Sequence, residues 1–296
     1  MKGIILAGGS GSRLAPLTNT TSKQLLPVYD KPMIYYPLST MIDLGVRDIL
    51  IISTSRDLPK IEELLGDGSR FGTKLNYQVQ EKPNGIAECF LIAGEFVDEP
   101  VALILGDNIF VLDEELPGLR AIASMHKLDS AQILLCPVKD PERFGVAECD
   151  EDGRVIRLVE KPPVPISNLA SVGLYFYPED VTEKVRALKP SARGELEITD
   201  LNNVYLNEGR LRSLRMNEKS KWLDAGTPDS LLESSVMMAQ EYHKRRNPTG
   251  YVEALSLRRG LIDETTFEQT IWRMKPGTPY REHLRNLVAV ASMRDE

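Results

Sequence analysis

The chain has little of what membrane-spanning, disulfide-bonded or nucleic-acid-binding proteins need. None of its 296 residues belongs to a run approaching the roughly 20 apolar residues that cross a bilayer. The first residues show no signal-peptide pattern, so we expect a cytoplasmic protein without a membrane partner. Cys89, Cys136 and Cys149 are widely spaced and form no CxxC pair, which argues against a disulfide framework and a structural zinc site. The net charge of −7 disfavours nucleic acid as a partner, because such binding needs a clustered basic surface.

Apolar runs rich in Ile, Val and Leu alternate with amphipathic stretches through the first third of the chain. The strand-like runs are 3–7, 48–53, 75–79 and 101–105, and the helix-like stretches are 33–45, 57–65 and 85–96. This order predicts an α/β fold that is Rossmann-like, with a mixed, mostly parallel sheet flanked by helices. We expect Asp57 to cap the helix that starts near Leu58, and Thr227 to cap a helix running to about residue 245.

The pattern changes in the second half of the chain. Shorter β-like runs over 132–138, 145–149, 155–159 and 171–177 are separated by turns, which predicts a small antiparallel extension of the sheet. After the turn-like break at 247–250 the sequence is mostly helix-compatible. We therefore expect residues 241–296 to form a C-terminal helical accessory region.

A glycine-rich segment directly follows the first strand, where open α/β sheets bind ligands. Its glycines let the backbone approach a phosphate chain closely, and Arg13 can place a planar guanidinium on phosphate oxygens. Lys23, about ten residues later, is well placed to neutralise a triphosphate. The residues of this part of the chain that are expected to bind the nucleotide are Leu6, Gly8, Gly9, Ser10, Gly11, Ser12 and Arg13, together with Asp107 further along the chain.

Two familiar glycine-loop families do not fit this segment. No Gly-Lys-Ser/Thr ends the loop, which disfavours a P-loop enzyme. Leu14 stands where the dinucleotide-binding pattern G-x-G-x-x-G requires glycine, and the second strand ends in hydroxyl residues rather than an acid. An NAD-dependent enzyme is therefore not expected.

Several motifs together resemble the bacterial glucose-1-phosphate thymidylyltransferases of the sugar nucleotidyltransferase family. The resemblance covers roughly residues 1–240. The motifs that carry it are 8–13, 22–27, 29–38, 65–68, 105–108, 160–162, 173–177, 193–200 and 222–227. It implies a catalytic domain over 1–240, in which 1–130 mainly binds nucleotide and 131–240 mainly binds sugar phosphate.

The resemblance implies attack by a sugar 1-phosphate oxygen on the α-phosphorus of dTTP, releasing pyrophosphate. The nucleophile is already anionic, so the protein mainly has to position two polyanions and neutralise their charge with cations and Mg²⁺. Asp107 and Asp224 match the family's metal-binding aspartates, although an Asp after a strand can also be only a turn former. The expected catalytic residues are Arg13, Lys23, Asp107, Lys161 and Asp224.

Base and sugar recognition are also implied by the resemblance. Gln80 and Gly85 match the family's base-binding residues, and a glutamine offers a donor and an acceptor to the edge of thymine or uracil. Glu160 and Lys161 resemble the family's residues that contact the sugar hydroxyls and the sugar phosphate, but they could instead be an exposed charge pair at a strand end. Arg193 resembles a phosphate-binding arginine and Glu195 a group that binds sugar hydroxyls, but either could instead cap the helix around 197–207. The residues expected at the sugar phosphate are Gly145, Glu160, Lys161, Ser171, Tyr175, Arg193, Glu195 and Trp222.

The chain departs from the usual family pattern at a few positions. Where the family reads Pro-Asp-Gly-Leu-Ala-Gln-Ala, residues 83–89 read differently, and Glu88 adds an acid beside the expected nucleotide pocket. Ser171 and Val172 replace the more usual Val-Thr. UTP or a modified sugar therefore stays open as an alternative, as does a regulatory protein that binds nucleotide sugars without catalysis. The resemblance further implies a homotetramer with a feedback nucleotide-sugar site near the C-terminal helices.

Overall fold

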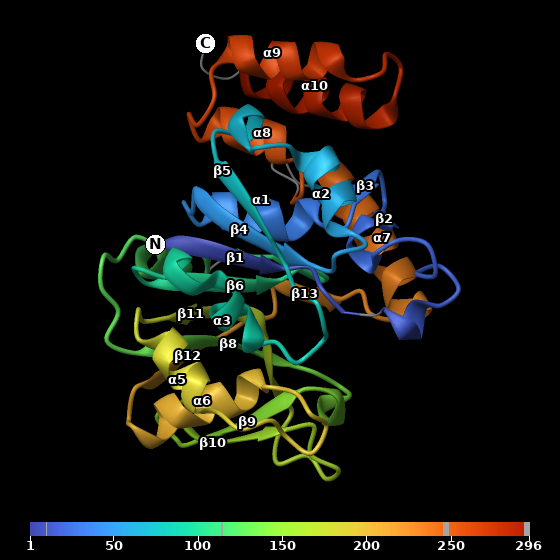
Figure 1. The fold of residues 1–296 in the computed structure, drawn as a ribbon. Coiled ribbons are helices and arrows are strands. Elements are labelled where there is room, and N and C mark those ends of the chain that lie inside the picture. The colour runs from blue at the N-terminus through green and yellow to red at the C-terminus, as the bar shows by residue number, and fades with distance from the viewer. Residues whose placement is uncertain (10, 114, 245–248, 293–296) are drawn as a thin grey trace.

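The computed structural model describes residues 1–9, 11–113, 115–244 and 249–292 (Figure 1). Nine strands of the described residues form one sheet in the order β10-β9-β11-β6-β1-β4-β5, and β8 and β12 extend from the other edge of β11. These strands are β1 Lys2–Leu6, β4 Asp48–Ser53, β5 Lys74–Val79, β6 Val101–Leu105, β8 Ala131–Pro137, β9 Gly145–Cys149, β10 Val155–Glu160, β11 Leu169–Tyr177 and β12 Leu211–Arg215. The mixed sheet predicted from the sequence is confirmed.

Helices cover both faces of this sheet. Neighbouring residues of β1 show why its sequence is a continuous apolar run: Ile4 and Ile5 are both fully buried and belong to different hydrophobic clusters. Successive strand side chains point to opposite faces, so a strand covered on both sides needs apolar residues at every position. The cluster around Ile5 includes residues of α1 Tyr35–Asp43, α2 Leu58–Leu65, α4 Leu116–Ala123 and α8 Val252–Arg258, and the cluster around Ile4 includes residues of α3 Glu88–Ala93, α5 Val181–Ala187 and α6 Ile198–Asn207.

The parallel and antiparallel parts of the sheet meet at β11. Strands β6, β1, β4 and β5 pair in parallel, whereas β11 runs antiparallel to β6, β8 and β9, and β9 pairs antiparallel with β10. The expected antiparallel extension is thus present. Two small antiparallel sheets accompany the large one: β2 Pro27–Val28 with β3 Lys31–Pro32, and β7 Asn108–Val111 with β13 Lys221–Asp224.

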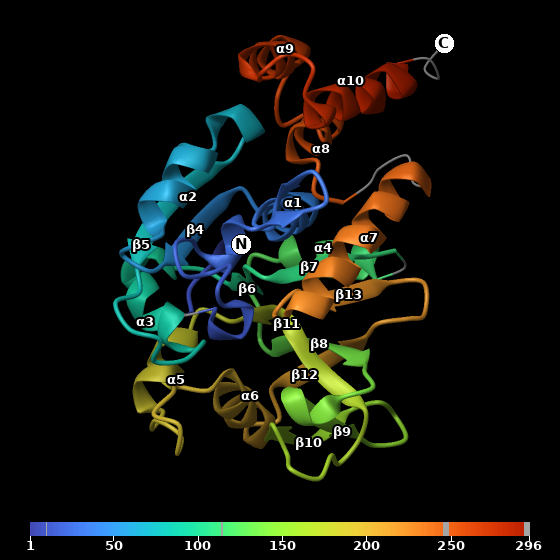
Figure 2. The ribbon, with the colours of Figure 1, turned by 90° about the vertical axis from the view of Figure 1, so that its right-hand side faces the viewer.

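The C-terminal part of the chain is helical, as expected. Helices α9 Glu264–Arg273 and α10 Pro279–Ser292 lie beyond α8 at the end of the molecule that carries α1 (Figures 1 and 2). A polar cluster joins them to the N-terminal part: the Lys31 ammonium lies 3.8 Å from the centroid of the Tyr251 ring, and Asp30 contacts Tyr251 and His283 at 2.8 Å. Among the helices of the described residues, none combines the length and apolar character needed to cross a membrane.

One of the two expected helix caps is present. Helix α7 Pro228–Lys244 begins after Thr227, whose Oγ1 accepts a hydrogen bond from the Ser230 amide at 3.2 Å. The prediction that the Asp57 side chain caps α2 was wrong. The Asp57 backbone is helical (φ −104°, ψ −23°) and its carboxylate accepts from Thr54 and Arg56 instead of from an α2 amide.

Candidate active site

The carboxyl ends of four parallel strands bring the predicted nucleotide-binding segments to one edge of the sheet. The Gly106 amide donates to the Leu6 carbonyl at 2.9 Å, so Asp107 follows β6 beside the start of the glycine loop. The Gln80 amide donates to the Ser53 carbonyl at 2.8 Å, which holds Gln80 at the end of β5 on the same edge. This is where parallel α/β sheets bind ligands.

A cavity of about 240 Å³ opens at this edge. Eight residues expected at the nucleotide or sugar line it: Leu6, Gly8, Gly9, Lys23, Gln80, Gly85, Asp107 and Glu195. Gln24, which sequence reasoning did not single out, also lines the cavity and donates through Nε2 to the Gly8 carbonyl at 3.3 Å. Its place in the motif 22–27 was the available signal.

The glycine loop turns tightly before Arg13. Gly11 has a positive φ of 61°, and its carbonyl accepts from Thr18 Oγ1 at 2.9 Å. Ser12 and Arg13 then lie in a short 3-10 helix, Ser12–Leu14. Ser10 lies outside the described residues. The Arg13 guanidinium passes close to Gly226, where a Cβ would stand 2.7 Å from its Nη2, so a side chain at position 226 would displace the arginine.

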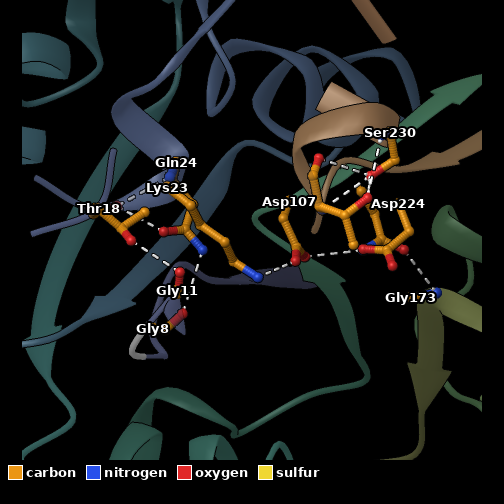
Figure 3. A network of polar contacts seen from close by, with 12 residues as sticks. Gly8, Gly11, Thr18, Lys23, Gln24, Asp107, Gly173, Asp224 and Ser230 are labelled. Carbon is orange, nitrogen blue, oxygen red and sulfur yellow. Dashed lines mark hydrogen bonds and ion pairs between the residues drawn. The ribbon is translucent and has the colours of Figure 1, made fainter. Parts of the chain in front are cut away.

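Lys23 and two aspartates form the centre of the site (Figure 3). The Lys23 ammonium is paired with the Asp107 carboxylate, and Asp224 lies on the opposite side of Asp107 from Lys23. The β7–β13 pair accounts for this arrangement, because Asp224 is in register with Asn108. Asp224 and Asp107 thus meet although they are far apart in the sequence.

The two aspartates differ in their electrostatics. Burial acts to raise the pKa of Asp107, but the charge and hydrogen bond of Lys23 outweigh it and hold that pKa below its ordinary value. Burial, followed by the negative charge of Asp107, raises the pKa of Asp224 above its ordinary value, while Lys23, Arg13 and Arg143 oppose the shift. The site therefore stores carboxylate repulsion that a cation would relieve.

The residues present fit Mg²⁺. Carboxylate oxygens are its preferred protein ligands, and it is commonly held by one or two of them together with substrate phosphates and water. Asp107 and Asp224 supply such a pair beside a phosphate-sized glycine loop. No cluster of three or more His, Cys, Asp or Glu side chains suited to a metal is found in the described part of the chain, so phosphates would have to complete the coordination.

Arg143 is a further cation at this centre that sequence reasoning missed. Its Nη2 lies 3.2 Å from Asp224 Oδ2, and its Nη1 is paired with Asp140. The guanidinium also packs 5.2 Å from the centroid of the Phe144 ring. Its position two residues before Gly145, already a candidate, was the only local signal.

The residues expected at the sugar phosphate form a second charged group next to the cavity. Arg193 Nη2 lies 3.1 Å from Glu195 and 3.6 Å from Glu160, and Lys161 lies 3.3 Å from Glu160. Lys161 has a positive φ of 42°, a left-handed conformation that is costly outside glycine and occurs often at functional sites. Arg193 also binds the Glu197 carboxylate at 2.7 Å, so it contacts the residue before α6 without capping an α6 amide.

Of the other candidates, Gly145, Ser171 and Tyr175 lie on the large sheet beside this group, whereas Trp222 lies on β13 and contacts Asn108 instead. Gly145 pairs with Ser171 between β9 and β11, and a Cβ on Gly145 would crowd Glu160 and the Thr199 hydroxyl. Thr199, which sequence reasoning missed, donates to Glu160 at 2.5 Å. Burial, and then the charge of Glu160, raises the pKa of Tyr175. The Trp222 indole donates to Asn108 Oδ1 at 2.6 Å, which ties β13 to β7.

A mixed α/β sheet whose carboxyl edge carries a glycine loop, several cations and two facing aspartates defines a nucleotidyltransferase. The chain belongs to the nucleotidyl transferase family, whose model matches residues 2–241. The resemblance stated from the motifs is thereby confirmed, and the protein is an enzyme of this class.

Two relatives in sequence carry the same name. A glucose-1-phosphate thymidylyltransferase of Mycolicibacterium smegmatis is 47% identical over 89% of this chain and 91% of its own length. One of Neisseria gonorrhoeae is 45% identical over 97% of this chain and 99% of its own. Among solved structures, a protein of Bacillus anthracis described as a glucose-1-phosphate thymidylyltransferase, in complex with sucrose, superposes with a TM-score of 0.74 at 43% identity, covering 80% of this chain and 94% of its own. A UDP-glucose pyrophosphorylase bound to UDP-glucose gives 0.68 at 26% identity, covering 82% and 99%.

Proposed function

We propose that the protein transfers a thymidylyl group from dTTP to glucose 1-phosphate, giving dTDP-glucose and pyrophosphate. The observation that carries the proposal is the distribution of charge around the cavity. Arg13 and Lys23 stand on the glycine-loop side, and Lys161 and Arg193 stand on the side of Glu160. One set of cations serves the triphosphate and the other serves the sugar phosphate, with Asp107 and Asp224 placed to hold Mg²⁺.

The protein residues act mainly by position and charge. Mg²⁺, when bound, would neutralise the charge that develops on the phosphate oxygens. Arg13 and Lys23 would hold the triphosphate, and Lys161 and Arg193 would orient the sugar phosphate so that its oxygen attacks the α-phosphorus in line with the leaving pyrophosphate. Glu160 and Glu195 would accept hydrogen bonds from sugar hydroxyls.

UTP is the second candidate for the nucleotide. The similarity to a UDP-glucose pyrophosphorylase supports it, and thymine differs from uracil by one methyl group, worth only roughly 1–3 kcal/mol of discrimination. Pyrophosphate release should be measured across dTTP and UTP, each with glucose 1-phosphate and with other hexose 1-phosphates. The proposal expects the largest kcat/KM for dTTP with glucose 1-phosphate. No turnover with that pair would refute it.

We also propose a homotetramer with a feedback site for a nucleotide sugar. The names of the relatives say nothing about assembly. Two surfaces of this structure support the tetramer and the feedback site. Leu232 and Val236 are 66% and 50% exposed on α7, as expected of side chains that a neighbouring subunit covers. A separate cavity of about 500 Å³ beside α8 is lined by Arg120, Arg258 and Arg259 together with Asp43, which pairs with Arg120 and Arg259; a diphosphate would have to compete with that carboxylate for these arginines.

A further inference from the structure

The amide of Gln80 is held in one orientation by the acid at position 88. Gln80 Nε2 donates to Glu88 Oε2 at 2.8 Å and to the Gly85 carbonyl at 3.3 Å. Gln80 Oε1 lies instead against the glycine loop, since a Cβ on Gly8 would stand 2.7 Å from it. Gln80, Gly8 and Gly85 all line the cavity at the sheet edge.

A carboxylate at position 88 makes this orientation obligatory. A carboxylate only accepts hydrogen bonds, so the Gln80 amide must turn its NH₂ toward Glu88, and the reversed amide would set two acceptors against each other. The other Glu88 oxygen accepts from Asn84 Nδ2 at 2.7 Å, so the carboxylate itself is held from two sides. A glutamine at position 88 could satisfy either orientation, because an amide both donates and accepts.

We propose that Glu88 is a positioning residue for base selection, which fixes Gln80 so that only its carbonyl oxygen is offered to the base. That acceptor matches a pyrimidine with a protonated N3, as in thymine or uracil, and opposes cytosine, whose N3 accepts. Glu88, which does not itself line the cavity, would therefore set the preference for a base with a protonated N3. The inference rests on the proposed function only in taking this cavity as the nucleotide-base pocket.

Binding without turnover tests the idea. Dissociation constants for dTTP and dCTP are measured by calorimetry in the absence of sugar phosphate, for the native protein and for Glu88→Gln. The native protein should prefer dTTP, and Glu88→Gln should lower the dTTP/dCTP preference roughly tenfold, the effect of about one hydrogen bond. If Glu88 has only a structural role, Glu88→Gln should weaken the binding of dTTP and of dCTP equally. An unchanged dTTP/dCTP ratio in this variant would overturn the proposal.

Two further variants isolate the effect. Glu81→Gln removes the same charge from an exposed residue next to Gln80 and should keep the native ratio; a matching fall in this variant would contradict the orientation argument. Glu88→Gln placed on a Gln80→Ala background should change the ratio no further, because the acid acts through Gln80. A further change there would also contradict the proposal, and this cycle remains readable if Glu88→Gln alone is less stable.

The binding test of Glu88 and the turnover test of the proposed reaction can fail independently. Failure of dTTP and glucose 1-phosphate to react, with a nucleotide ratio that still shifts in Glu88→Gln, would remove the proposed reaction and leave the role of Glu88 intact. Normal turnover by a native protein that binds dTTP and dCTP equally well would keep the proposed reaction and remove the role of Glu88.

Discussion

At the scale of single residues, the candidate site is organised by ion pairs between its cations and its carboxylates. Lys23 is paired with Asp107, Arg143 with Asp224, and Lys161 with Glu160. Each cation is thus held near the place where a phosphate is expected. When the phosphate binds the cation, the carboxylate that was paired with it can bind a metal ion or a sugar hydroxyl instead. Such preorganised charges cost little reorganisation during the reaction.

We expect Arg13 to act mainly in the transition state. Its guanidinium lies close to Gly226, and its positive charge acts on the Asp224 carboxylate. Arg13→Ala should lower kcat about a hundredfold with a smaller loss of dTTP binding, because neutralisation is needed most as charge develops. Steady-state kinetics and nucleotide calorimetry measure the two effects. Arg154→Ala, at an exposed hairpin residue, is the matched control, and unchanged turnover in Arg13→Ala would contradict the assignment.

The sequence indicated most of these residues but not their partners. Arg13, Lys23 and Asp107 follow strands whose carboxyl ends share an edge, so their convergence was predictable. The pairing of Arg143 with Asp224 joins residues 81 apart, and it depends on how β9 and β13 are placed. No periodicity or spacing encodes such a contact. The same holds for Gln80 and Glu88, whose bond depends on the turn between β5 and α3.

At the scale of elements, strands covered on both faces were the easiest to predict. Strands β1, β4 and β6 are largely continuous apolar runs because helices pack on both of their sides, whereas the edge strand β5 alternates polar and apolar residues. Strand β12 was not predicted from the sequence. Arginines and a serine interrupt its two leucines, and its pairing partner β8 is distant in the sequence. The Asp57 cap failed for a local reason, because neighbouring Arg56 and Thr54 compete for its carboxylate.

Asp180 joins three of the elements on the α5–α6 side and gives a pH-dependent test. It accepts from Tyr205 of α6 at 2.8 Å and from Arg210, just before β12, at 2.7 Å. Burial acts to raise the pKa of Asp180, but the bonds from Arg210 and Tyr205 and the nearby cations lower it overall. A folded pKa below the unfolded value of about 3.9 means that the stabilisation is present above that value and is lost as the pH falls through the folded pKa.

Asp180→Asn should therefore lower the free energy of unfolding by about 1–2 kcal/mol at pH 7. The difference from the native protein should shrink as the pH falls below about 4. Denaturant unfolding over a pH series measures it, with the exposed Asp152→Asn as control. A difference that stays constant down to pH 2.5 would show that the effect is not caused by the charge of Asp180.

At the scale of the whole molecule, the cluster around Lys31 joins the C-terminal helices to the N-terminal part of the chain, and α7 carries exposed apolar side chains. A homotetramer would have four times the mass of one 33.1 kDa chain. Light scattering coupled to size exclusion should give that mass, and Leu232→Glu with Val236→Glu should reduce it, because a charge cannot be buried in an apolar interface without large cost. Ile156→Glu, on β10, is the control. A native protein that elutes as a monomer at micromolar concentration would refute the tetramer.

The two aspartates and the surrounding cations are proposed to form one site that joins two phosphorylated substrates. The most direct test of this proposal is pyrophosphate release from dTTP and glucose 1-phosphate with Mg²⁺, compared between the native protein and Asp224→Asn. The native protein should turn over only when both substrates and Mg²⁺ are present, and Asp224→Asn should be at least about a hundredfold slower while still binding dTTP. Native-like turnover in Asp224→Asn, or none in the native protein, would contradict the account.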